Sequence, residues 1–500
     1  NVMQQQNNAL VKPLIKLGIK IMIASLLLSV VGCQQTHIEF TDLKEPSLPA
    51  FDQLKGAPSL APLAITPANE LVSKSLNSEL TLYQLHNTLS GLNHLSLVAY
   101  STAPMTNLDV IVQAFTEKKR WLAQQSPLAC TESLCIRANM HSLTLSIDCP
   151  RSAEQASELL MQFWQADSFD NIDIANVRRQ LKLAKHINAY SGAEIDAVWA
   201  DKILGEQHIY NQALNNRDLA DELDLPKLNQ IREVIFAQSK WAILTNAQLA
   251  QDQQFIATVT QQFESLAVSA QGATMELESK PVINPTTPLS NSNKTLFIID
   301  APGSVQTQVR IGYPLNAADQ DGNSIQNCKL LASWLGRSFS GRLYYDLREV
   351  RSLTYGIYGR CFDNPLSRTL KFYGSTKLEH SGAFIHGVLD HLALAAESKA
   401  SLNEISALQT YLTSQEMLRQ ANYRAIEADT IKQLVRGISL SQKQAEHIRL
   451  NQLTASQLQQ IAHSVFSKTP YIVIRGDRDK IEADLRLKLP DWELIEAQAN

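Results

Sequence analysis

Histidine and carboxylate side chains are the residues from which metal or acid–base chemistry would be built, and the chain has eleven histidines. A hydrolytic zinc site needs two neutral imidazoles and a carboxylate placed to activate water. Neither His-x-x-Glu-His nor His-Glu-x-x-His occurs anywhere in the sequence. We therefore expect no catalytic residue and no metal ligand set of these two patterns.

The run His386-Gly-Val-Leu-Asp390-His391 comes nearest to a cluster of metal ligands. His386 and Asp390 are one helical turn apart, a spacing at which a weak metal site is conceivable. The two histidines are five residues apart and would lie on different faces of a helix. We interpret the run as polar positions of an amphipathic helix.

The cysteines divide into one near the N-terminus and five in the body of the chain. The five are Cys130, Cys135, Cys149, Cys328 and Cys361. An odd number leaves at least one thiol unpaired. If residues 136–149 form a hairpin that turns at Asn139-Met140, Cys130 lies opposite Cys149, and this pair is our first disulfide prediction. The Cys130-x4-Cys135 spacing would also suit a metal site, but no second Cys or His pair with zinc spacing accompanies it.

The N-terminal segment has the pattern of an export signal. Basic residues at 12, 16 and 20 precede an apolar stretch, 21–31, that is too short to span a bilayer as a helix. Because Cys33 directly follows Gly32, residues 1–33 resemble a bacterial lipoprotein signal peptide, in which the Cys thiol is lipidated. The resemblance to Gram-negative lipoproteins, in which an Asp after the Cys favours the inner membrane, implies the outer membrane for Gln34. We predict a lipid-anchored protein of the bacterial cell envelope, facing the periplasm; a short membrane anchor is the alternative.

Composition and charge describe a folded protein that does not bind nucleic acid. The chain is 44% hydrophobic and 19% charged, with a net charge of −4 and a pI near 6.3. These values lack the basic footprint of a nucleic-acid-binding protein. Five hundred residues exceed one ordinary domain, so two or more hydrophobic cores are expected.

The first half of the chain is predicted to be a tether followed by a lobe. Residues 34–78 are rich in Pro, Ser, Ala and Leu without clear periodicity, which predicts a tether. Residues 79–269 form the first predicted lobe. Its predicted strands are 80–86, 94–100, 134–149 and 241–246, and its predicted helices are 107–124, 152–166, 172–189, 227–238 and 249–266.

A proline-rich linker, residues 270–293, separates this lobe from a second one, residues 294–490, in which the pattern restarts. Predicted strands are 295–300, 305–313, 355–362, 369–376 and 471–475. Predicted helices are 324–339, 341–349, 382–398, 402–421, 423–436, 454–466 and 480–487.

The two halves echo each other. Residues 227–245 form a helix that ends in Phe236 and leads to the strand Trp241-Ala-Ile-Leu-Thr. Residues 450–475 repeat this order, with Phe466 before Tyr471-Ile-Val-Ile-Arg. The echo predicts an internal duplication. We expect an α+β fold of two duplicated lobes, each a mostly antiparallel sheet with helices on one face.

A specific resemblance lies in the second half. The run from Leu331 reads Leu-Ala-Ser-Trp-Leu-Gly-Arg-Ser-Phe-Ser-Gly-Arg-Leu-Tyr-Tyr-Asp-Leu-Arg-Glu-Val-Arg-Ser-Leu-Thr-Tyr, ending at Tyr355. Together with the strand entry at 300–312, it resembles the second lobe of the pitrilysin/insulinase metallopeptidase family. Residues 170–270 resemble the back half of the first lobe more diffusely. The resemblance implies two lobes that form a clam-like chamber for an unfolded peptide.

In that family the first lobe holds zinc through His-x-x-Glu-His, and the second supplies an Arg and a Tyr that contact the substrate and help stabilise the oxyanion. The resemblance places Arg348 and Tyr355 at these substrate-binding positions. Ser352 stands where the family has Gly, so the turn that carries Tyr355 is expected to differ if that Gly is left-handed. The alternative is that Arg348 pairs with Glu349 or Asp346 and that Tyr355 packs.

The zinc half is missing, because residues 107–119, where the zinc helix is expected, contain no histidine. The resemblance therefore implies a subunit with no cofactor of its own that contributes its Arg/Tyr lobe to a zinc peptidase formed with a His-x-x-Glu-His partner. A peptide-binding or scaffolding envelope lipoprotein is a second hypothesis. A metallopeptidase with an atypical zinc site drawn from His86, His94, His141 and nearby Glu residues is a third.

Overall fold

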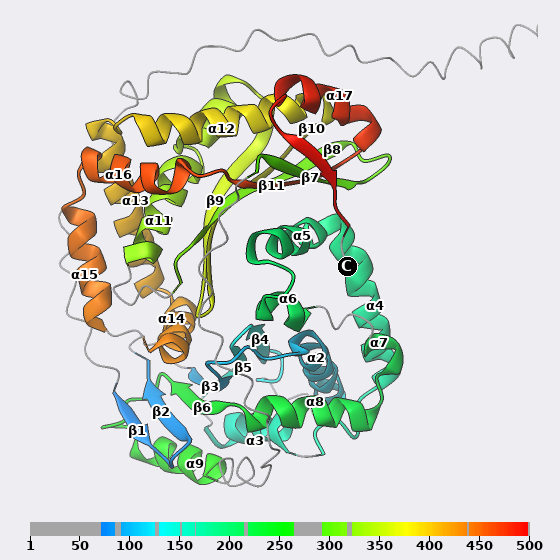
Figure 1. Ribbon diagram of the computed structural model, residues 1–500. Coiled ribbons are helices and arrows are strands. Elements are labelled where there is room, and N and C mark those ends of the chain that lie inside the picture. Colours follow the sequence, from blue (N-terminus) through cyan, green and yellow to red (C-terminus); the bar gives the residue numbers. More distant parts are fainter. Residues whose placement is uncertain are drawn as a thin grey trace, which may run out of the picture. The chain divides into compact units, whose positions relative to one another are not determined.

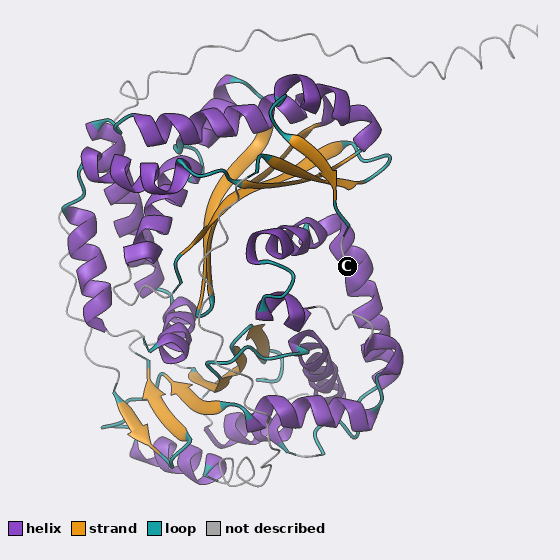
Figure 2. Ribbon diagram, in the orientation of Figure 1, coloured by secondary structure: helices purple, strands orange, loops and turns teal. Residues whose placement is uncertain are grey.

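The computed structural model describes nine stretches of the chain: residues 72–85, 92–125, 130–150, 153–165, 167–214, 219–264, 293–317, 323–437 and 440–498. The predicted signal peptide with its lipidation residue Cys33, most of the tether and of the linker, and His86 lie outside these residues. The described part is α+β, with two mixed six-stranded sheets packed with helices (Figure 2). None of its helices combines the length and apolar composition that crossing a bilayer needs.

The first sheet has the strand order β1-β2-β6-β3-β5-β4. Its strands are β1 (Ser73–Ser75), β2 (Leu80–Gln84), β3 (Asn93–Tyr100), β4 (Cys135–Asn139), β5 (Ser142–Cys149) and β6 (Lys240–Thr245). Only the β2–β6 pairing is parallel. β1 lies within the range predicted as a tether.

Helices cover the main face of this sheet (Figure 1). The first-half helices are α2 (Leu108–Gln125), α3 (Ala153–Trp164), α4 (Ile174–Ser191), α5 (Ala193–Leu204), α6 (Ile209–Leu214), α7 (Leu219–Glu222), α8 (Leu225–Ala237) and α9 (Gln253–Phe263). Residues of α2, α3, α8 and α9 share one core with Leu97 and Ile243 of the sheet. Local signals set the helix starts: Asp173 and Asp224 accept backbone N–H groups at the N-termini of α4 and α8.

The second sheet has the order β12-β7-β11-β8-β10-β9. Its strands are β7 (Thr295–Asp300), β8 (Gln306–Leu315), β9 (Thr354–Asn364), β10 (Ser367–Lys377), β11 (Tyr471–Gly476) and β12 (Glu493–Glu496). The β12–β7 and β7–β11 pairings are parallel and the others antiparallel. β12 lies beyond the predicted end of the lobe at residue 490.

The second-half helices bury one face of this sheet in a core that includes Trp334, Phe372 and Phe384. They are α11 (Asn323–Gly336), the π-helix η2 (Tyr344–Val350), the 3₁₀ turn η3 (Leu378–His380), α12 (Ser381–Glu397), α13 (Leu402–Gln420), α14 (Tyr423–Arg436), α15 (Leu440–Asn451), α16 (Ala455–Phe466) and α17 (Arg478–Lys488). The helix predicted for residues 341–349 is therefore present, but most of it is π-helical.

The topology agrees with the predicted duplication. Strands β2-β6-β3-β5-β4 of the first sheet correspond in order to β7-β11-β8-β10-β9 of the second. Each sheet also meets one helix from the other half on the face opposite its main helical layer. Ile195 and Trp199 of α5 pack on β7 and β11, whereas Ile431 and Val435 of α14 pack on β3 and β6. Helix α5 was not predicted from the sequence.

The disulfide prediction is confirmed: Cys130 is bonded to Cys149. The hairpin β4–β5 that brings them together turns at Met140-His141, one residue later than predicted. A second disulfide joins Cys328 of α11 to Cys361 of β9. Cys135 is the free thiol of the described chain.

Candidate functional site

The segment from η2 to the start of β9 carries both predicted substrate-binding residues. Its turn is closed by Leu353 N–H, which donates to Leu347 O at 2.8 Å. Ser352 has a φ of 54°, in the left-handed region. The position is therefore left-handed, as a glycine there would suggest, and Ser352 adopts that conformation at a cost of about 1–2 kcal/mol. The replacement of Gly by Ser does not abolish the turn.

A buried ion network holds η2 on α12. Asp346 is fully buried; its Oδ2 lies 2.7 Å from His391 Nε2, and its Oδ1 accepts Arg351 Nε at 3.1 Å. On another face of α12, His386 Nδ1 lies 3.1 Å from Asp390 Oδ2. The two histidines therefore lie on different faces, as predicted. The interpretation as surface polar positions holds for His386, but it is wrong for His391, which anchors η2.

Arg348 lies at the surface of η2. Its Nη1 donates to the hydroxyl of Tyr344, its guanidinium stacks 4.8 Å from the centroid of that ring, and its Nε lies 3.3 Å from Glu349 Oε1. The predicted pairing with Glu349 is thus present, whereas Asp346 is used by other partners. Because the side chain is 37% exposed, it can exchange these contacts for a ligand at small cost.

Tyr355 does not pack. It follows Thr354 at the start of β9, the edge strand of the second sheet, and is 79% exposed. No hydrogen bond or ring contact joins the Tyr355 and Arg348 side chains in this described segment. The structure therefore brings both residues to one exposed segment without joining them, and the phenol is available to a partner.

A row of aromatic rings extends this surface along the sheet. Phe339, which is 76% exposed, lies 5.3 Å from Tyr344 between ring centroids. Tyr344 is 6.2 Å from Tyr358, and Tyr358 is 5.7 Å from Tyr373. Sequence reasoning missed this row, because strand pairing, which places Tyr358 directly opposite Tyr373, is invisible along the chain. Within this row Phe339 is the exposed ring that offers stacking area, whereas Tyr344 is buried and Tyr358 and Tyr373 are half-buried.

Arg342, the arginine earlier in the motif, has a structural role. Its Nε and Nη2 donate to Glu404 Oε1 and Oε2 at 2.6 and 2.8 Å, and Trp334 Nε1 donates to Oε1 at 3.1 Å. Burial opposes ionisation of Glu404, but these hydrogen bonds outweigh it and hold its pKa below the ordinary value. The network joins α11 and α13 to Arg342, which precedes η2 along the chain.

The first-lobe histidines of the third hypothesis lie in separate networks. His94 Nδ1 is 2.7 Å from Asp148 Oδ1, and its Nε2 is 2.6 Å from Glu427 Oε2. His141 Nδ1 is 3.0 Å from Ser101 O, and its Nε2 is 2.6 Å from the Tyr210 hydroxyl. Within the described residues, no three His, Cys, Asp or Glu side chains are grouped to hold a metal ion.

Comparison with known proteins gives one family match. The family model described as "Peptidase M16 inactive domain" matches residues 250–412, which include the whole η2–β9 segment. None of the curated protein sequences is significantly similar to the chain.

Several solved structures share the fold. A peptidase M16 inactive domain from Pseudomonas fluorescens has a TM-score of 0.62 and 15% identity, covering 81% of this chain and 98% of that one. A protease from Helicobacter pylori has a TM-score of 0.62 and 12% identity, covering 81% and 99%. A chain of complex III2 from Candida albicans, with Inz-5 bound, has a TM-score of 0.65 and 12% identity, covering 85% and 100%. Residues 250–412 are therefore similar to a peptidase M16 inactive domain, and the described part of the chain shares its fold with these solved structures.

Proposed function

We propose that the protein is the non-catalytic subunit of a zinc-dependent peptidase. In this proposal Arg348 and Tyr355 contact the peptide backbone, and a partner subunit with His-x-x-Glu-His supplies the zinc and the base. The observation that carries the proposal is the exposure of Tyr355. A large aromatic side chain that is 79% exposed, on a segment anchored by buried ion networks, has no packing role.

The chemistry of the two side chains suits the proposed task. A phenol and a guanidinium are both hydrogen-bond donors, and donors held on a rigid support stabilise the negative charge that develops on a peptide carbonyl oxygen. The cost of the left-handed Ser352 supports the same role, because strained backbone is commonly retained where it positions a functional group.

A partner is also proposed because the described residues of the first lobe offer no replacement for the zinc motif. Helix α2 has no histidine, and both ring nitrogens of His94 and of His141 are engaged by protein groups. One of the chains with the same fold belongs to a multisubunit assembly, complex III2. We further propose that lipidation of Cys33 places the assembly at the outer membrane of a bacterial envelope.

The test is reconstitution. The partner is first identified by cross-linking and mass spectrometry of membranes, and the purified subunits are then assayed alone and mixed on a quenched fluorescent peptide. We expect no cleavage by this chain alone and cleavage by the mixture. Tyr355→Phe should lower kcat of the mixture about 10²-fold, since it removes one donor to the oxyanion. Arg348→Ala should lower kcat/KM by a similar factor.

Matched controls lie on the same strand. Tyr358→Phe removes a phenol from the aromatic row, and Arg360→Ala removes an exposed guanidinium that stacks on Phe362. Both should leave kcat within about twofold, because neither sits at the predicted substrate-binding positions. If mixing leaves cleavage by the zinc subunit unchanged while the chain still binds the peptide, the function is that of a peptide-binding envelope protein without a catalytic partner.

A further inference from the structure

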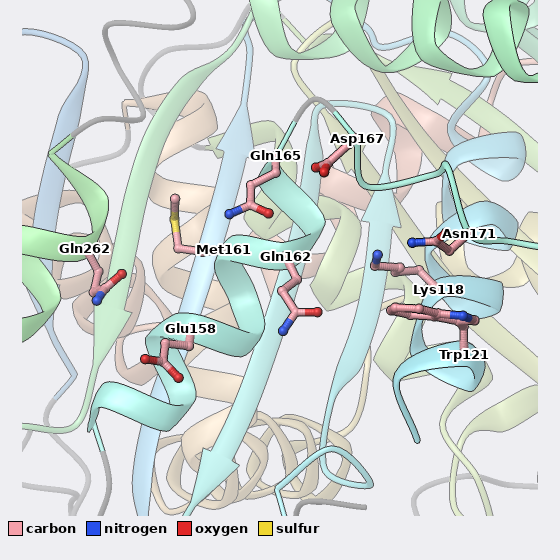
Figure 3. Close-up of a pocket in the computed structure, with 9 residues that line it drawn as sticks. All are labelled: Lys118, Trp121, Glu158, Met161, Gln162, Gln165, Asp167, Asn171 and Gln262. Atoms are coloured by element: carbon pink, nitrogen blue, oxygen red, sulfur yellow. The ribbon is translucent and has the colours of Figure 1, made fainter. Parts of the chain in front are cut away.

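A polar cavity lies in the first lobe among α2, α3, α9 and the loop between α3 and α4 (Figure 3). Its volume is about 450 Å³, which lies within the range of small-molecule sites. It shares no residue with the Arg348–Tyr355 segment. Binding in this cavity is therefore independent of the proposed peptidase function.

Lys118 is the residue that sets this cavity apart. The side chain is only 5% exposed, and its ammonium lies 4.5 Å from the centroid of the Trp121 ring (Figure 3). Within the described residues it donates no hydrogen bond and forms no ion pair. Burial lowers its pKa, and the charges of Asp167 and Asp170 oppose that shift without approaching to ion-pair distance. The ammonium thus lines the cavity with a cation–π contact but without an acceptor.

The next residue, Lys119, shows how the ammonium of a lysine on this helix can find hydrogen-bond acceptors. Lys119 Nζ donates to Leu134 O at 2.8 Å and to Glu132 O at 3.1 Å. A buried cation without such acceptors destabilises the folded state, and a cation–π contact offsets only part of that cost. The cation–π contact therefore does not explain why a lysine is buried here. An anionic oxygen entering the cavity would accept the hydrogen bonds that the ammonium can donate.

The other charged groups of the cavity restrict what can carry that oxygen. The carboxylates of Glu158 and Asp167 line the same cavity. Two negative charges would repel a purely anionic ligand, but they would attract an ammonium group on a ligand whose carboxylate reaches Lys118. A small zwitterion satisfies both signs of charge at once.

The uncharged lining suits the same ligand. Gln162, Gln165 and Asn171 present carboxamides, each of which both donates and accepts hydrogen bonds, as needed for peptide or amide groups. Met161 and the Trp121 ring supply apolar surface for a short aliphatic portion.

We propose that this cavity binds a small zwitterion, an amino acid or a short peptide, with its carboxylate on Lys118 and its ammonium toward Asp167 and Glu158. Amino acids and short peptides both carry a carboxylate and an ammonium, and they differ in the distance between these two charges.

Calorimetric titration of the whole chain tests the proposal with L-glutamine, L-alanyl-L-alanine and tri-L-alanine. We expect at least one of them to bind, and the one that binds best reports the spacing of the two charges. Capping that ligand, as its C-terminal amide or its N-acetyl derivative, should weaken binding at least about tenfold, because each cap removes one of the charges.

The matched variants are Lys118→Met and Lys240→Met, which remove the same charge from the cavity and from an exposed position at the start of β6. Lys118→Met should abolish binding and raise the melting temperature of the unliganded protein, because a buried unpaired cation is removed. Lys240→Met should change neither. The capped ligands need no variant, so the test stands even if Lys118→Met does not fold.

Three results would overturn the proposal. They are the absence of binding by all three zwitterions up to about 10 mM, equal affinity for capped and uncapped ligands, and full binding by a folded Lys118→Met protein. Binding of an uncharged disaccharide in place of the zwitterions would likewise reassign the cavity to another ligand class.

Discussion

Each sheet receives one helix from the other half of the chain, and the two contacts are built from different charges. On the first sheet, Glu427 of α14 is fully buried and lies against His94 of β3 and Arg137 of β4. Asp148 of β5 completes the group by accepting the Tyr423 hydroxyl at 2.8 Å. We call this group the α14 contact.

On the second sheet, Asp196 of α5 accepts Arg310 Nε at 2.6 Å and Lys371 Nζ at 2.8 Å. Glu194 adds a longer pair with Arg475 at 3.2 Å. The side chain of Asp196 is 43% exposed, while both of its cationic partners are buried. We call this group the α5 contact. It contains no histidine.

The difference teaches that duplication preserved the arrangement but not its electrostatics. In the α14 contact the Glu427 carboxylate is excluded from water. One of its cationic partners is a histidine, so the strength of the contact depends on whether that histidine is protonated. In the α5 contact water reaches the carboxylate and screens it. Burial disfavours the charged forms of both His94 and Asp196, but the attractions to their partners are stronger. The hydrogen bonds with Asp148 and Glu427 therefore raise the pKa of His94, and Arg310 and Lys371 lower the pKa of Asp196.

The largest expected effect is that of Glu427→Gln. Removing one charge from a buried ion group typically lowers the free energy of unfolding by 3–5 kcal/mol, and we expect about 3 kcal/mol. The value is at the low end because His94 can release its proton and Arg137, 37% exposed, can turn to solvent. Urea denaturation measures the loss, and hydrogen exchange of the β3 and α14 amides should localise it. A loss below about 1 kcal/mol would contradict the distinction between the two contacts.

A smaller effect is expected for Asp196→Asn. Water already screens this carboxylate, so we expect the free energy of unfolding to fall by only about 1 kcal/mol. The same urea experiment, repeated at high salt, should show that the loss shrinks further. If Asp196→Asn lowers the free energy of unfolding as much as Glu427→Gln does, the exposure of the carboxylate does not determine the strength of the two contacts.

The smallest effect is the pH response of the α14 contact. Because the folded pKa of His94 is raised above about 6.5, its contribution is complete below that pH and is lost as the pH rises through the folded pKa. The loss stays below that of Glu427→Gln, since Arg137 still pairs with Glu427 and Tyr423 with Asp148. The measurement is the difference in unfolding free energy between the native chain and His94→Gln from pH 6 to 9.

That difference should shrink with rising pH. Other histidines titrate in both proteins and cancel in the difference, including His141 and His208, whose pKa values burial lowers. A difference that is constant or that grows with pH would show that His94 is neutral in the folded state.

Much of the fold was predictable from short stretches of sequence. The restart of the strand pattern after residue 293, the hairpin that pairs Cys130 with Cys149, and the helix ending at Phe466 before β11 all depend on neighbours within about twenty residues. The motif ending at Tyr355 was likewise identifiable from its spacing, whereas the replacement of Gly by Ser352 was expected to alter the turn and the structure shows Ser352 in the left-handed region.

Other features were out of reach because their causes lie far apart along the chain. Helix α5 is apolar where it meets β11. The strand that this face packs on lies in the other half of the chain, so the neighbouring sequence does not indicate the contact. Asp346 of η2 meets His391, which is 45 residues further along the chain, and the Phe339–Tyr373 row depends on strand register. The sequence does not distinguish Lys118 from other lysines, because the cavity that it lines is completed by α3 and the loop that follows α3.

By itself the sequence determined the two-lobed α+β plan, one disulfide and the positions of Arg348 and Tyr355 in the motif, because periodicity, turn residues and motif spacing are local properties; the exposure of these two side chains was decided by the tertiary structure. Tertiary structure alone decided which charges meet. His94 and Glu427 are 333 residues apart, and only the packing of α14 on the first sheet removes both from water and turns an ordinary histidine and glutamate into a proton-dependent contact.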